Sequence, residues 1–144
     1  MQIEHLKELL KYQYSSRADA QGYSVDCWGY VQAYYQLVLG IEVSDYLSVY
    51  DETSPYAPID ATLEQAAADG WRKVETPAIH DVGIYQWSDL RTHAVICTRV
   101  NPTLMAIHVP INMRARQERV DIGSWSQRLV GWFRHPKLVG DNHA

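Results

Sequence analysis

The chain has 144 residues, of which 47% are hydrophobic and 21% are charged, a composition typical of one globular domain and not of a disordered segment. Thirteen Lys and Arg residues against 17 Asp and Glu residues give a formal net charge of -4, which argues against a general nucleic-acid-binding protein. No segment approaches the ~18 consecutive apolar residues of a membrane helix, so no membrane insertion is expected.

Helical patterns dominate the N-terminal part of the chain. Apolar residues recur at helical spacing over 3–12, and the charges among them distinguish this helix from a secretory signal, so we expect synthesis in a cytoplasm. The polar segment 15–25 predicts a loop. The next pattern predicts a helix over 27–39, with Asp26 as its cap and Gly40 as its left-handed end.

A long irregular connection is predicted over 41–59. It contains three tyrosines that suit a cleft wall or a docking surface: Tyr46, Tyr50 and Tyr56. A third helix is predicted over 61–69, with Asp60 as its cap and Gly70 as its end.

After Gly70 the hydrophobic period becomes two, which predicts β-strands. The expected strands are 82–87, 93–100, 104–109, 128–134 and, with a less regular pattern, 117–123. Helices followed by strands predict an α+β fold in which N-terminal helices pack on an antiparallel sheet. We expect one domain over 1–136 and a polar C-terminal tail over 137–144.

Cys27 is the residue most indicative of chemistry, because it lies at the predicted start of a helix. The positive end of the helix dipole and the first backbone N–H groups both favour a thiolate, which is the nucleophilic form of cysteine. A small buried side chain is the alternative interpretation. Cys97 lies in the middle of a predicted strand and is interpreted as part of the core.

Two histidines on one predicted hairpin are candidates for the base that a cysteine nucleophile needs. If Arg99 opposes Leu104, position 108 faces position 95, and His93 and His108 become diagonal neighbours on one face of the sheet. A shift of one residue would separate them, and the sequence leaves that register open. Two histidines and a cysteine also suggest a metal site, but their spacing matches no compact zinc signature. The other histidines are assigned no chemistry: His5, His80, His135 and His143.

Five segments, in the same order, resemble motifs of the NlpC-type cell-wall cysteine peptidases, which are papain-like enzymes. Residues 26–31, Asp-Cys-Trp-Gly-Tyr-Val, resemble the family's nucleophile motif Asp-Cys-Trp-Gly-Leu-Val. The Trp after the Cys is typical of tail-assembly and tail-tip proteins of tailed phages, including lambda-type phages. The other similar segments are 71–74, 81–85, 93–96 and 131–136, the last resembling the closing Gly-Phe-Tyr-Arg-His-Pro of the phage branch.

The resemblance implies a papain-like fold and a cysteine peptidase that uses no cofactor and no metal. It assigns Cys27 as nucleophile, His93 as general base and His108 as the third residue, which orients the His93 ring. The oxyanion hole is expected to use the Cys27 backbone N–H and a tyrosine hydroxyl, for which Tyr14 fits best and Tyr12 is the alternative.

By the same resemblance the substrate is a stem peptide of peptidoglycan, often cleaved between D-glutamate and diaminopimelate. Arg17 is a candidate to bind a substrate carboxylate. The resemblance places the protein in the tail of a phage or prophage particle, with other tail-tip proteins as partners. A structural tail subunit without activity and a non-phage cell-wall amidase are the alternatives.

This chain departs from the family pattern at three places. It has Ser15-Ser16-Arg17 where the family has Trp-Gly-Gly, and it has His80 and Val95 where the family has glycines. These changes affect the shape of the loops beside the cleft, so they bear on Tyr14 more than on Cys27 or His93.

Overall fold

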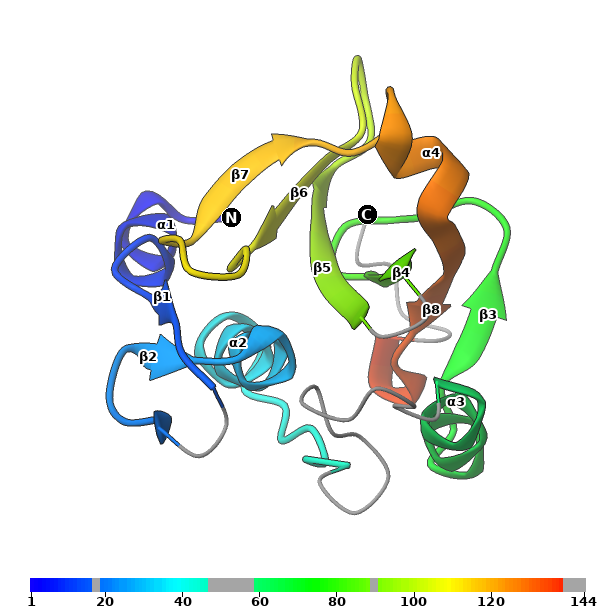
Figure 1. The fold of residues 1–144 in the computed structure, drawn as a ribbon, viewed down its shortest axis with the longest axis horizontal. Coiled ribbons are helices and arrows are strands. Elements are labelled where there is room, and N and C mark those ends of the chain that lie inside the picture. The colour runs from blue at the N-terminus through cyan, green and yellow to red at the C-terminus, as the bar shows by residue number, and fades with distance from the viewer. Residues whose placement is uncertain (17–18, 47–58, 89–90, 139–144) are drawn as a thin grey trace.

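The computed structural model of the chain describes residues 1–16, 19–46, 59–88 and 91–138 (Figure 1). Within this part, six strands form an antiparallel sheet, and they are β3 (Arg72–Val74), β4 (Val82–Ser88), β5 (Arg91–Arg99), β6 (Met105–His108), β7 (Arg116–Arg119) and β8 (Leu129–Arg134). Their order in the sheet is β3-β8-β4-β5-β6-β7. The predicted α+β class is therefore confirmed, and so are the five predicted strands, except that β7 ends at Arg119 and the predicted strand over 117–123 is wrong for its last four residues. β3 was not predicted as a strand.

The helices are α1 (Ile3–Leu9), α2 (Cys27–Tyr34) with a π-helical turn η2 (Tyr35–Leu39), α3 (Ile59–Ala68), α4 (Ser124–Arg128) and a 3-10 turn η3 (Pro136–Leu138). The first helix is shorter than predicted, and α4 was not predicted. α3 begins at Ile59, before Asp60, so the predicted helix start at residue 61 is wrong.

The segment predicted as a loop over 15–25 ends in a short strand. β2 (Ser24–Val25) pairs in parallel with β1 (Gln13–Tyr14), so the loop prediction is wrong for its last two residues. Because β2 ends just before α2, this pairing fixes how the chain enters the helix that begins with Cys27.

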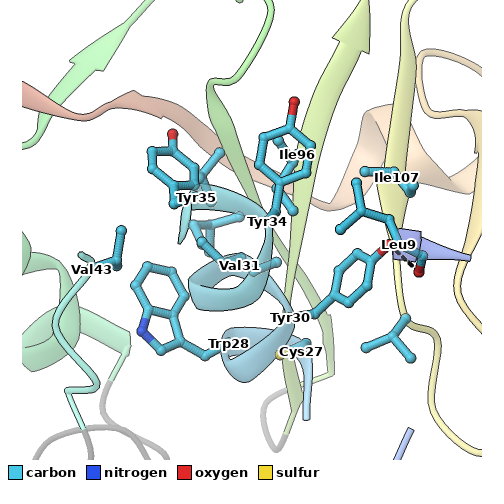
Figure 2. Close-up of a cluster of buried hydrophobic side chains, with 14 of the residues drawn as sticks. Leu9, Cys27, Trp28, Tyr30, Val31, Tyr34, Tyr35, Val43, Ile96 and Ile107 are labelled. Atoms are coloured by element: carbon cyan, nitrogen blue, oxygen red, sulfur yellow. Dashed lines mark hydrogen bonds between the residues drawn. The ribbon is translucent and has the colours of Figure 1, made fainter. Parts of the chain in front are cut away.

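α2 packs on β5 and β6 through one side of the sheet, as Figure 2 shows. Tyr30, Val31 and Tyr34 are fully buried on the helix, and Ile96 and Ile107 are fully buried on the strands. Each of the aliphatic side chains among them stabilises the fold by about 1.5–3 kcal/mol through apolar burial. These contacts hold the first residue of α2 close to the sheet.

The opposite side of the sheet has a second apolar cluster. Its buried members are Tyr85, Val95, Cys97, Ala106, Val120 and Trp132. Cys97 is fully buried there, which confirms its prediction as a core residue. Burial raises the pKa of the Cys97 thiol to about 12, so this cysteine stays protonated.

The predictions for the C-terminal tail and for the tyrosines of the connection over 41–59 have different outcomes. Leu138 is only 5% exposed and packs in the core, so the predicted polar tail does not begin at residue 137. Tyr46 is buried and donates a hydrogen bond to the Asp69 carboxylate over 2.8 Å, so it is part of the core and not a docking surface. Tyr50 and Tyr56 lie outside the described residues.

Candidate active site

Cys27 is the first residue of α2, as the sequence predicts. The Asp26 side chain caps this helix by accepting a hydrogen bond from the Gly29 N–H over 2.7 Å, and Gly40 ends the following π-turn with φ 65°. A Cβ atom at Gly29 would lie 3.0 Å from the capping oxygen, so a glycine lets the cap approach closely. The cap fixes the helix start and therefore the position of the Cys27 side chain.

The Cys27 thiol lies beside the beginning of β5. Its sulfur is 4.0 Å from the backbone oxygen of Thr92, the residue directly before His93. Cys27 is 4% exposed, so the thiol is largely removed from solvent. The fold thus brings the predicted nucleophile next to the strand that carries the predicted base.

The register between β5 and β6 agrees with the prediction over the middle of the hairpin. Ile96 faces Ile107 and Cys97 faces Ala106, the pairs that follow when position 95 faces position 108. Near the turn the register shifts after Cys97, so Arg99 faces Met105 and not Leu104. The pairing that was supposed for the turn is therefore not formed, but the irregularity lies beyond the residues that decide the site.

This register brings His93 and His108 together. Nε2 of His93 lies 2.6 Å from Nδ1 of His108, and the two ring centroids are 4.9 Å apart in an edge-to-face arrangement. His93 is 9% exposed and His108 is 2% exposed. Two buried imidazoles joined by a short hydrogen bond can hold each other in a fixed orientation and pass on a change of protonation.

Glu118 extends this pair, and sequence reasoning missed it. Its Oε2 lies 2.6 Å from Nε2 of His108, and the Arg116 Nε lies 3.3 Å from the same oxygen. Burial, and secondarily the charge of Arg116, lowers the pKa of His108 to about 4, so this ring is neutral at neutral pH. The irregular pattern around 117–123 gave no indication of which side chains of this strand face β6.

A pocket of about 300 Å³ adjoins the two histidines. Aromatic and aliphatic side chains form most of its wall, and two charged side chains complete it. Its lining residues are Trp87, His93, His108, Pro110, Ile111, Met113, Arg116, Glu118 and Trp125. Trp125, on the unpredicted α4, meets the His108 ring edge-on with centroids 5.4 Å apart. The indole covers the imidazole pair and narrows access to it.

The two candidate oxyanion tyrosines have different surroundings. Tyr14 pairs with Val25 of β2, two residues before Cys27, and its N–H donates to the Met113 oxygen over 2.9 Å. The Tyr12 ring packs edge-on against Tyr23 and Tyr30, with centroids 5.0 and 5.4 Å apart. These ring contacts concern the Tyr12 ring and not its hydroxyl, so both tyrosines remain candidates for the oxyanion hole. Arg17 lies outside the described residues.

A second buried polar network lies at the other end of the sheet. Arg134 donates to Asp81 from Nε over 2.9 Å and from Nη2 over 2.8 Å, and the Ala78 N–H donates to the same carboxylate over 2.7 Å. Both charged residues belong to segments that resemble family motifs. Their contacts explain the motifs as structural requirements of the sheet.

The other described histidines in this region also have structural contacts. His80 has φ 82°, a backbone conformation that favours glycine, and its Nδ1 lies 2.8 Å from the Tyr34 hydroxyl. A left-handed backbone at this position explains why the family pattern has a glycine there. His135 accepts a hydrogen bond from the Lys137 N–H over 3.0 Å. Across the residues that the structure describes, no group of three His, Cys, Asp or Glu side chains is placed to hold a metal ion.

No protein-family model matches the sequence, and no curated protein matches it significantly. Among solved structures, the chain is similar to a lipoprotein-like protein of the NLP/P60 family from Staphylococcus aureus, with a TM-score of 0.58 and 18% identity. The match covers 90% of this chain and 39% of that one, so this chain spans well under half of that protein. The shared fold confirms the predicted NlpC-type architecture.

In the described residues, no helix is both long and apolar enough to cross a membrane.

Proposed function

We propose that this protein is a cysteine peptidase that hydrolyses the stem peptides of peptidoglycan, with Cys27 as nucleophile, His93 as general base and His108 as the residue that orients the base. The observation that carries the proposal is the 2.6 Å hydrogen bond between the two buried imidazoles, together with the 4.0 Å distance from the Cys27 sulfur to the backbone oxygen of Thr92, the residue before His93. The fold shared with an NLP/P60 protein supports the substrate class.

The geometry suggests which nitrogen does the chemistry. Because Nε2 of His93 is bonded to His108, the remaining Nδ1 takes the thiol proton from Cys27. The thiolate attacks the substrate carbonyl carbon, and the resulting oxyanion is stabilised by the Cys27 N–H and the Tyr14 hydroxyl. His93 returns the proton to the leaving amine, and water then hydrolyses the thioester, which releases the acid and regenerates the thiol.

The pocket beside the histidines is the proposed binding place for the peptide on one side of the cleaved bond. Its apolar wall suits aliphatic side-chain carbons, and Arg116 at its edge suits a carboxylate. Following the family resemblance, the bond from D-glutamate to diaminopimelate is the first to be tested.

We also place the protein in the tail tip of a phage or prophage particle, among other tail proteins, where it would open the cell wall during DNA entry. The support is the sequence resemblance around Trp28 and over 131–136. Trp28 is buried, and its indole N–H donates a hydrogen bond to the Ser44 oxygen over 2.8 Å, so the residue typical of this branch is part of the core.

Digestion of purified peptidoglycan sacculi tests the activity. Wild-type protein should release soluble muropeptides with new amino termini, and Cys27→Ala should reduce the rate by about 10⁴-fold or more. Cys97→Ala is the matched control, since it removes the other thiol and should retain hydrolysis in the folded fraction. Hydrolysis that survives Cys27→Ala would refute the assigned nucleophile, and a folded wild type without hydrolysis would favour the structural-subunit alternative.

A further inference from the structure

Glu118 is a half-buried carboxylate that the catalytic assignment leaves unused. It lies on β7, and its Oε2 contacts Nε2 of His108 at 2.6 Å, while Nδ1 of His108 contacts Nε2 of His93 at 2.6 Å. A continuous chain of three side chains therefore runs from the pocket edge to the proposed base. Each link is short enough for a strong hydrogen bond.

We infer that Glu118 is a positioning residue that fixes which nitrogen carries the proton in both imidazoles, and so presents an unprotonated His93 Nδ1 to the thiol. This inference rests on the proposed function, because it concerns the same base. Glu118 meets His108, which in turn meets His93, so it acts on the base through His108.

Donor and acceptor counting leads to this conclusion. An ionised carboxylate only accepts hydrogen bonds, so Nε2 of His108 must carry a proton. A neutral imidazole has one donor and one acceptor, and burial keeps His108 neutral, so its Nδ1 must accept. The proton in the link to His93 therefore belongs to Nε2 of His93. That leaves Nδ1 of a neutral His93 as the basic atom.

The surroundings of His108 favour this arrangement over the reverse one. Its charged neighbours are Glu118 and Arg116 on β7, its titratable neighbour on β5 is His93, and α4 presents the uncharged Trp125. Arg116 Nε also lies 3.3 Å from the Glu118 oxygen that meets His108, which holds that oxygen in place. Without the carboxylate, nothing in this set selects the productive tautomer.

Glu118→Gln tests the inference in the full-length protein, with sacculi as substrate. We expect kcat to fall about 10- to 100-fold, because the variant alters the base. Glu118 also lines the pocket, but glutamine keeps the size of the side chain, so KM should change less than twofold. Asp121→Asn is the matched control: it removes a carboxylate near the same strand that pairs with Arg119 at 2.5 Å and should leave kcat unchanged.

Nitrogen-15 NMR of the histidines supplies a readout that a merely structural role would not move. In Cys27→Ala protein, where no thiol can give its proton to His93, both Nε2 atoms should show protonated shifts and both Nδ1 atoms unprotonated shifts at pH 7. Adding Glu118→Gln should mix the tautomers of both rings. The opposite tautomer in the protein with Glu118 intact overturns the inference, even if the double variant does not fold.

The two proposals fail in distinguishable ways. If the wild type hydrolyses sacculi and Glu118→Gln retains kcat within twofold, the role of Glu118 is wrong and the function stands. If the wild type is inactive but the NMR signals show the expected tautomers that Glu118→Gln disturbs, the function is wrong and the assignment of Glu118 as the residue that sets the protons stands.

Discussion

Two buried polar networks on the same sheet differ in the kind of side chain that forms them. At one end Asp81 and Arg134 form a two-pronged ion pair, reinforced by the Ala78 N–H. At the other end His93 and His108 form a chain that ends on Glu118. The first network holds fixed charges, because a guanidinium does not lose its proton at any pH a protein tolerates. The second contains imidazole rings, which gain and lose protons far more readily than a guanidinium does.

The comparison indicates that the Asp81–Arg134 network serves the stability of the sheet and that the histidine network serves its chemistry. A buried carboxylate with a permanent cation can only hold its strands together. Imidazoles joined by hydrogen bonds can also transfer a proton. We therefore expect changes in the first network to alter stability, and changes in the second to alter activity and pH dependence.

The largest effect on stability is expected for Arg134→Ala. Asp81 is fully buried, so removing its cation leaves an uncompensated charge and should lower the free energy of unfolding by about 3–5 kcal/mol. Arg119→Ala, which breaks an exposed pair with Asp121, is the control and should cost at most about 1 kcal/mol. Urea unfolding gives both values, and equal losses for the two variants would contradict the comparison.

The second prediction concerns acid. Because burial lowers the pKa of His108 to about 4 from an ordinary value near 6.5, the unfolded chain binds this proton more readily than the folded one. The neutral His108 therefore contributes about 3 kcal/mol to the free energy of unfolding above about pH 6.5, and this contribution is lost as the pH falls toward 4. As the pH falls through this range, the difference in unfolding free energy between wild type and His108→Gln should shrink by that amount. Parallel curves of unfolding free energy against pH would show that His108 is not the group responsible.

The smallest expected effect distinguishes the two cysteines. An alkylating reagent at mildly acidic pH should modify Cys27 at least about tenfold faster than Cys97. The helix start favours the thiolate form of Cys27, whereas burial raises the pKa of Cys97 and keeps it protonated. Mass spectrometry of the digested protein measures both rates. In urea the two thiols should react alike, and slow, equal labelling of the native protein would remove the case for an activated Cys27.

Local patterns were sufficient for most of the fold because they depend on residues close in the chain. The capping of α2 by Asp26, its end at Gly40 and the period-two strands all follow from neighbours within a few positions. The elements that were missed, β3 and α4, are three and five residues long and carry too few residues for a period. Likewise, β2 is a strand only because β1 lies beside it.

The sequence by itself determined that Cys27 begins a helix and that His93 and His108 occupy strands of one hairpin. Only the tertiary structure decided that the two imidazoles meet, that Glu118 continues the chain and that Trp125 covers it. The physical reason is register: a strand shifted by one residue turns every side chain to the other face, and that choice is made by packing across the whole sheet.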